Sequence, residues 1–135
     1  MKKISIVLFI AVSTFAFATQ QPDLKASVQR GKKVYETYCL SCHQPDGKGM
    51  QGMNPPLIKT KQVLGNKTQL INIILAGLDE ELVIDGVTYL NPMPSQPHLK
   101  DQEIADVLTY VRNSFGNKAS LVTTAEVKAA RAKIK

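Results

Sequence analysis

The sequence is poor in large aromatic side chains. Its 135 residues include no tryptophan, four phenylalanines and four tyrosines. A single domain of this length can bury a substantial core. With so few large apolar groups available, we expect something other than side chains to fill part of the interior.

Long hydrophobic runs are also missing, apart from one at the start of the chain. Lys2 and Lys3 precede an apolar stretch from Ile4, which ends in the small residues Ala16 and Ala18. This is the three-part layout of a secretory signal cleaved after Ala18. The apolar stretch has 15 residues, whereas a membrane-spanning helix needs roughly 20. We therefore expect residues 1–18 to be removed and no transmembrane anchor to remain.

Acidic residues are fewer than basic ones, and the excess of positive charge is modest. The formal net charge is +6, and loss of Lys2 and Lys3 with the signal would leave +4. The lysines are scattered and are not interleaved with aromatic residues, which argues against nucleic-acid binding. A modest positive charge fits a soluble surface or steering toward an acidic partner, and the sequence does not decide between these two.

Cysteine is scarce as well: the only two are Cys39 and Cys42, and His43 follows at once. A disulfide across so short a loop contributes little stability, and a zinc site would lack its fourth ligand. A thioredoxin-like redox pair opens a helix after a buried strand. Here the apolar spacing of residues 24–38 predicts a helix before the cysteines, and the Gly- and Pro-rich residues 44–56 predict a loop after them.

C-x-x-C-H is instead the attachment signature of a c-type haem. The two thiols add to the two vinyl groups on one side of the porphyrin, so the backbone must present both sulfurs from one turn. We therefore expect Cys39 and Cys42 to hold one covalent haem c, and His43 to bind its iron as the proximal ligand.

The similarity to a known family extends well beyond these five residues. Residues 31–57, GKKVYETYCLSCHQPDGKGMQGMNPPL, resemble the opening helix, haem site and following loop of class I c-type cytochromes. Residues 90–117, LNPMPSQPHLKDQEIADVLTYVRNSFGN, resemble their sixth-ligand loop and closing helix. The resemblance implies a mainly α-helical cytochrome c fold around one covalently bound haem, and a function in electron transfer.

The sixth ligand of the iron decides between electron transfer and chemistry on a small ligand. Met93 is flanked by two prolines, which stiffen the segment, and a methionine followed by proline is the usual sixth ligand in the family that the sequence resembles. We therefore expect Met93 to bind the iron. His98 is the alternative ligand, although we expect it to face solvent, and Met50 and Met53 are expected to pack in their loop against the porphyrin.

Other segments are predicted to form the scaffold. A helix is expected from Asn66, as its N-terminal cap, to Gly77. Asp85 and Gly86 lie between β-branched residues and predict a short β-hairpin over residues 82–90, which would support or partly cover the distal edge of the haem. The apolar spacing of residues 104–111 predicts a last long helix.

The resemblance also implies structural roles for individual residues. Gly31, Tyr35 and Tyr110 match the positions at which the first and last helices cross. Either Pro55 or Pro56 would accept a hydrogen bond from the proximal histidine, which would orient its ring and raise its basicity. The sequence leaves open which proline does so.

Two helix starts near the end of the chain raise questions. Lys100 stands where relatives often have a serine or threonine cap, so Asp101 is an alternative cap for the last long helix. Thr123 and Glu126 form a capping box that starts a short basic helix. This helix is too short to be stable alone in water, so it docks on the domain, frays or contacts a partner.

The predicted organisation is a signal peptide at residues 1–18, a cytochrome c domain at 19–117 and a C-terminal extension at 118–135. We expect a periplasmic electron carrier, not an enzyme, that exchanges electrons with redox partner proteins through a His/Met-ligated haem. Two alternatives remain. One is a ligand-binding, peroxidase-like or sensor haem domain with an open sixth site, and the other is a fixed electron-entry subunit of a larger redox enzyme.

Overall fold

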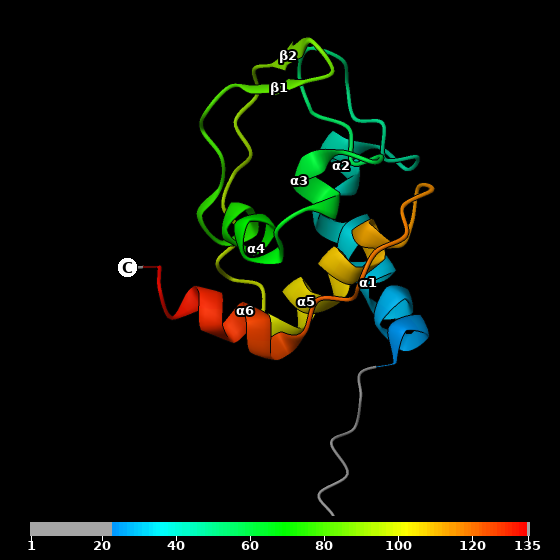
Figure 1. The fold of residues 1–135 in the computed structure, drawn as a ribbon, viewed down its shortest axis with the longest axis vertical. Helices are drawn as coiled ribbons and strands as arrows, with labels where there is room; N and C mark the ends of the chain where they lie inside the picture. The colour runs from blue at the N-terminus through cyan, green and yellow to red at the C-terminus, as the bar shows by residue number, and fades with distance from the viewer. Residues whose placement is uncertain (1–22, 135) are drawn as a thin grey trace, which may run out of the picture.

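The computed structural model describes residues 23–134, which form six α-helices and one two-stranded antiparallel sheet (Figure 1). In chain order the elements are α1 (Leu24–Tyr38), α2 (Leu40–His43), α3 (Lys61–Leu64), α4 (Lys67–Ala76), β1 (Leu82–Ile84), β2 (Val87–Tyr89), α5 (Asp101–Arg112) and α6 (Thr124–Arg131). The expected mainly helical fold with a hairpin is confirmed. The signal peptide expected at residues 1–18 lies outside the described residues. Within residues 23–134, no helix is long and apolar enough to cross a membrane.

Helices α1 and α5 cross at Gly31. A Cβ atom at this position would clash with the backbone carbonyl of Asp106 and would lie 2.8 Å from the Cβ atom of Tyr110. The absence of a side chain therefore lets the two helix backbones approach each other. Tyr35 packs beside the crossing, with its ring centroid 5.3 Å from that of Tyr110. The structural roles expected for Gly31, Tyr35 and Tyr110 are confirmed.

A buried carboxylate joins the same two helices. Asp106 on α5 accepts hydrogen bonds from Ser27 Oγ at 2.6 Å, Arg30 Nε at 2.7 Å and Arg30 Nη2 at 2.8 Å, all from α1. Burial by itself raises the pKa of the Asp106 carboxyl, but the hydrogen bonds from Arg30 and Ser27 outweigh it, so that the pKa lies below its ordinary value. The ionised carboxylate is therefore the form that holds α1 and α5 together.

Helix α4 begins and ends as its sequence predicts. The side chain of Asn66 accepts a hydrogen bond from the backbone N–H of Gln69 at 3.1 Å, which satisfies one free donor of the first turn. The helix ends at Gly77, whose φ of +82° suits a residue without a Cβ atom. Leu70 and Ile74 point into the core.

The hairpin also follows its sequence signal. Leu82 pairs with Tyr89, and Ile84 pairs with Val87. Between the strands, Asp85 and Gly86 both have positive φ angles, of 49° and 79°, as a two-residue type I′ turn requires.

Helix α5 is capped by Lys100 and begins at Asp101, one residue earlier than it would if Asp101 were the cap. Lys100 is the N-cap, and its backbone N–H donates to the Glu103 side chain at 2.8 Å. Asp101 does not cap the helix, because it lies in the first turn and accepts a hydrogen bond from Arg131 Nε on α6 at 2.7 Å.

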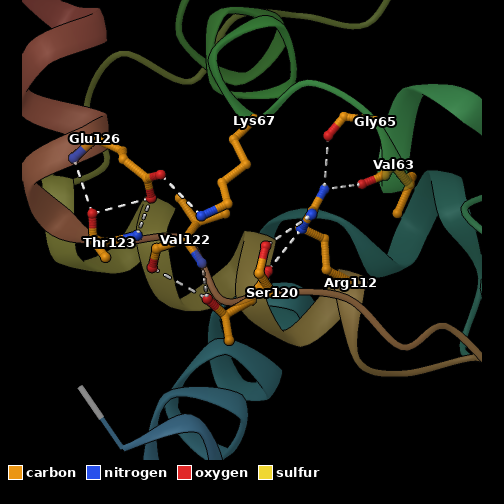
Figure 2. Close-up of polar contacts among 9 residues, drawn as sticks. Val63, Gly65, Lys67, Arg112, Ser120, Val122, Thr123 and Glu126 are labelled. Carbon is orange, nitrogen blue, oxygen red and sulfur yellow. Dashed lines mark hydrogen bonds and ion pairs between the residues drawn. The ribbon is translucent and has the colours of Figure 1, made fainter. Parts of the chain in front are cut away.

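The C-terminal helix α6 docks on the rest of the domain, which settles one of the questions left by the sequence. The capping box is present: the Thr123 backbone N–H donates to Glu126 Oε2 at 2.7 Å, and the Glu126 N–H donates to Thr123 Oγ1 at 3.2 Å. Val127 and Ala130 are buried in the core. Lys67 Nζ on α4 lies 2.9 Å from Glu126 Oε1 (Figure 2).

One buried arginine forms hydrogen bonds to the segment that leads to α6. Arg112, near the end of α5, donates to the backbone carbonyl of Val63 and, through Nε at 3.0 Å, to the carbonyl of Ser120 (Figure 2). These bonds link α5 both to the end of α3 and to the start of the C-terminal segment.

Candidate haem-binding site

An apolar pocket lies between α2, α4, α5 and the hairpin. Most of its wall consists of aliphatic side chains such as Leu57, Val63, Leu70, Ile73, Ile74 and Leu108. Cofactor pockets are typically lined in this way, by hydrophobic side chains with a few polar groups among them. The pocket fits the expectation that something other than side chains fills part of the interior.

Three of the four predicted site residues line this pocket. Cys39 comes from the end of α1, His43 from α2 and Met93 from the segment after the hairpin. Cys42 is exposed and is not part of the pocket wall, although it lies on α2 next to His43. The fold thus brings together residues from two segments that are far apart in the sequence.

One helical turn presents the two thiols and the imidazole. The backbone N–H of His43 donates to the carbonyl of Cys39 at 2.9 Å, and that of Gln44 donates to Leu40 at 2.9 Å. Residues three apart on such a turn lie on the same face, so Cys39 and Cys42 are neighbours. Gln44 has a φ of 64° and ends the helix.

A single backbone carbonyl orients the ring of His43. Its Nδ1 atom lies 3.0 Å from the carbonyl oxygen of Pro55, and because a carbonyl can only accept, Nδ1–H must donate. The lone pair of Nε2 is then available for a metal. Of the two candidate prolines, Pro55 is therefore the partner.

Burial favours the neutral forms of the pocket residues. It lowers the pKa of His43, against the opposing effect of the hydrogen bond to Pro55, so the imidazole stays unprotonated, as a metal ligand must be. Burial, followed by the nearby Cys42, raises the pKa of Cys39 to about 11. A redox-active cysteine pair needs a lowered thiol pKa, so this environment argues against a thioredoxin-like role. In residues 23–134 no group of three or more His, Cys, Asp or Glu side chains is arranged to hold a metal ion.

The segment of Met93 is fixed through its backbone. Its N–H donates to the Leu78 carbonyl at 2.8 Å, and the Leu78 N–H donates to the Met93 carbonyl at 2.9 Å. Gly77 is the residue before Leu78, and a Cβ atom on it would lie only 2.7 Å from the Met93 carbonyl oxygen. The end of α4 and the methionine segment are therefore in close backbone contact.

The other candidate ligands lie outside the pocket. His98 is exposed, as expected, and its ring packs edge-on against Tyr38 with centroids 5.4 Å apart. Met50 and Met53 are 45% and 46% exposed and do not line the pocket, so the expectation that they pack against the porphyrin is wrong. The reason is local: Met50 pairs with Asn54 through two backbone hydrogen bonds of 2.8 Å, which closes a tight turn at the surface.

Sequence reasoning did not name the hairpin residues that enter the pocket. Leu82, Ile84 and Tyr89 line it, because residues directly opposite each other in an antiparallel pair share one face. The turn signal at Asp85 and Gly86 fixes the register of the hairpin, and with it the residues that share a face; the three consecutive apolar residues of β1 do not by themselves show which side faces the pocket. The contact between Leu78 and Met93 has no such signal in the sequence.

These residues fit a covalently held haem: an apolar pocket, two thiols on one helical turn, an oriented imidazole and a thioether. Comparisons with known proteins point the same way. The cytochrome c family matches residues 28–115. Cytochrome c-552 of Thermus thermophilus is 36% identical over 112 residues, which cover 76% of this chain and 85% of that protein. Cytochrome c6 of a Nostoc species is 32% identical over 113 residues, covering 82% of this chain and 92% of that protein.

One further relative is a subunit of a larger enzyme. The cytochrome subunit of fructose dehydrogenase from Gluconobacter japonicus is 39% identical over 109 residues, which cover 76% of this chain but only 22% of that subunit. The family match and the similarity over most of the length of the small cytochromes agree with the pocket. The chain belongs to the cytochrome c family, whose members transfer electrons through a covalently bound haem c.

Proposed function

We propose that the apolar pocket holds one haem c, bound through thioethers of Cys39 and Cys42, with His43 and Met93 as the two axial ligands of its iron. The chain then carries electrons between redox partner proteins. The observation that carries this proposal is that Met93, fifty residues away in the sequence from His43, lines the same pocket as Cys39 and His43.

When bound, the haem supplies a one-electron couple. The residues around it have separate tasks. The Pro55 carbonyl holds the tautomer and orientation of the His43 ring. The bridge to Leu78 holds the Met93 segment, and a thioether ligand raises the reduction potential. The aliphatic wall keeps water away from these groups.

The test is the visible spectrum of the purified holoprotein, oxidised and then reduced, before and after addition of carbon monoxide. A covalent haem whose reduced spectrum does not respond to the gas supports a closed electron carrier. A response in the wild-type protein would overturn the assignment of Met93 and favour a ligand-binding haem domain.

Met93→Ala should make the reduced protein sensitive to carbon monoxide and lower its potential, whereas Met53→Ala, a change in an exposed methionine, is the matched control. An unchanged Met93→Ala spectrum would point to His98.

We also propose that the chain is exported to the periplasm and begins at Thr19 after cleavage, with the haem domain at residues 19–117 and the extension at 118–135. The layout of the first eighteen residues supports this. Mass spectrometry of the haem protein from a periplasmic fraction tests it, since retention of residues 1–18 would contradict cleavage.

Similarity to a dehydrogenase cytochrome subunit supports a second possibility, that this chain is a fixed subunit of a redox enzyme. Gel filtration of an untreated periplasmic extract, followed by haem staining, separates the two. A free carrier elutes at the mass of the single chain, and a fixed subunit elutes with a larger complex.

A further inference from the structure

Exposed apolar side chains gather at the hairpin and at the loop beside it. Among the exposed large hydrophobic residues of the described chain, Leu90 and Val83 are the most exposed, at 62% and 61%. Met50 and Met53 in the neighbouring loop are almost half exposed. Large exposed apolar side chains that lie together on a soluble domain mark interaction sites.

Backbone hydrogen bonds join the loop to the hairpin. The N–H of Leu90 donates to the Gly52 carbonyl at 3.4 Å, and that of Asn91 donates to the Met53 carbonyl at 3.1 Å. The side-chain amide of Asn91 also donates to Asn54 Oδ1 at 3.1 Å. The loop therefore lies directly beside the exit of β2, so its exposed methionines are close to Leu90.

The hairpin and the segment that leads into it are acidic, although the chain as a whole is basic. Asp79, Glu80, Glu81 and Asp85 are all exposed, and none of them takes part in the ion pairs formed within residues 23–134. Residues 78–99 include no lysine or arginine. We call the exposed apolar and acidic residues of the hairpin and its loop the hairpin surface: Met50, Met53, Asp79, Glu80, Glu81, Val83, Asp85 and Leu90.

Much of the positive charge lies elsewhere. Figure 1 places the hairpin at the opposite end of the molecule from α6 and from the start of α1. Those helices and the residues that follow α6 carry Lys25, Arg30, Lys128, Arg131 and Lys133. Arg30 and Arg131 are paired with Asp106 and Asp101, which leaves Lys25, Lys128 and Lys133 as cations at that end outside the ion pairs of residues 23–134. The hairpin end is therefore the more negative of the two.

The hairpin surface is also the outer side of the pocket wall. Val83 is exposed, while its neighbours on β1, Leu82 and Ile84, line the pocket. A protein bound against Val83 would be separated from the pocket by the hairpin alone. Since electron transfer slows steeply with distance, this is a favourable place for a donor or acceptor.

We propose that the hairpin surface is the docking site for a redox partner that presents an apolar contact surrounded by lysine and arginine. The proposal rests on the proposed function, because it assumes a haem in the pocket. Apolar burial supplies affinity at the centre of such an interface, and opposite charges around it steer the encounter. The local negative field attracts a cationic partner that the positive net charge alone would repel.

The test uses a small oxidant as a stand-in for the partner. Reduced holoprotein is mixed in a stopped-flow instrument with tris(phenanthroline)cobalt(III), a cation with apolar ligands, and in parallel with the anion ferricyanide. If the cation reacts at the hairpin surface, its rate falls as ionic strength rises, because salt screens the attraction. A reaction governed by the positive net charge would show the opposite trend, and that result would overturn the proposal.

Two matched variants locate the site. Glu81→Gln/Asp85→Asn removes two negative charges from residues that do not line the pocket. We expect the reaction with the cobalt complex to be about threefold slower at low ionic strength. This is a small part of the rate enhancement that a charged surface can give to an oppositely charged reactant. Ala129→Lys/Ala132→Lys changes the net charge equally, but at exposed positions on α6 and at its C-terminal cap, and should leave the rate nearly unchanged. Equal effects of the two variants would rule out the hairpin surface as the site.

A third variant tests the apolar contribution to docking. Val83→Ser should slow the reaction with the phenanthroline complex and leave the ferricyanide rate unchanged; equal slowing of both reactions would contradict an apolar contact at this residue.

The spectra distinguish failure of the proposed function from failure of the docking surface. All variants should keep the wild-type spectrum, potential and indifference to carbon monoxide. If the wild-type protein itself responds to carbon monoxide, the proposed function fails, whereas a normal spectrum with the wrong salt dependence refutes only the docking surface.

Discussion

Leu78 and Met93 exchange two backbone hydrogen bonds, with N···O distances of 2.8 and 2.9 Å. This bridge connects the end of α4 to the segment that carries the proposed sixth ligand. Gly77, immediately before Leu78, has a φ of +82° and lies so close to Met93 that a Cβ atom would be 2.7 Å from its carbonyl oxygen. The position of Met93 therefore depends on a residue that is sixteen positions away in the sequence and has no side chain.

Gly77→Ala should displace Met93. The backbone conformation at Gly77, with a ψ of −176°, is one that essentially only glycine adopts, and we expect a cost of about 1–3 kcal/mol in the free energy of unfolding. The added methyl group also pushes on the Met93 carbonyl, so the reduced holoprotein should become sensitive to carbon monoxide and its potential should fall. The measurements are the visible spectrum with and without the gas and a redox titration.

Gly86→Ala is the matched control for Gly77→Ala. Gly86 also has a positive φ, of +79°, but nothing lies within 4 Å of its Cβ position. This variant should lose stability through backbone strain alone and keep the wild-type response to carbon monoxide. If both variants behave alike in the presence of the gas, the contact between Gly77 and Met93 does not position the ligand.

The features that the sequence predicts well are those encoded by neighbouring residues. The turn of Asp85 and Gly86, the cap at Asn66 and the capping box of Thr123 and Glu126 all depend on residues that are close in the chain. The C-x-x-C-H spacing is equally local. Such signals describe the backbone of a short segment, and the structure confirms these predicted turns and caps.

The features that the sequence leaves open depend on contacts between distant segments. The choice of Pro55 over its neighbour follows from how the loop returns to His43. Because Lys100 caps α5, Asp101 lies in the first turn and pairs with Arg131 of α6. The docking of α6 itself depends on burial that no local pattern reveals. The same holds for the bridge between Leu78 and Met93.

Gly31→Ala tests the crossing of α1 and α5. In an isolated helix, alanine is more favourable than glycine by about 1 kcal/mol. Here the methyl group would clash with the backbone carbonyl of Asp106, which cannot move without shifting α5. We therefore expect alanine to be destabilising at this position. The free energy of unfolding should fall by about 3 kcal/mol, within the range of overpacked cores. Urea titration of the holoprotein measures this, and a variant more stable than the wild type would contradict the close approach.

Val127→Ala tests whether α6 is an integral part of the domain. Val127 is fully buried against the core, so shortening its side chain should lower the free energy of unfolding by about 1–2 kcal/mol through lost burial and a small cavity. Ala129→Ser, on the exposed side of the same helix, should have little effect. Chemical denaturation followed by circular dichroism separates the two. Equal stabilities for the two variants would mean that α6 is not held on the domain in solution.

Asp106→Asn tests the buried carboxylate between α1 and α5. The folded-state pKa of Asp106 lies below its ordinary value, which is about 3.9 in an unfolded chain. Its ionised form therefore contributes stability that is fully present above about pH 4 and is lost as the pH falls through the lower folded-state pKa. At pH 7, replacing the carboxylate should cost about 2 kcal/mol, because the charged hydrogen bonds from Ser27 and Arg30 are lost.

Urea titrations of the holoproteins between pH 7 and pH 2 should show the stabilities of the wild type and the variant converging at the acid end. Both proteins share the same haem ligation, so the difference between them isolates Asp106, and Asp85→Asn on the exposed hairpin turn should show no comparable convergence. A gap between the wild type and Asp106→Asn that stays constant down to pH 2 would contradict the lowered pKa.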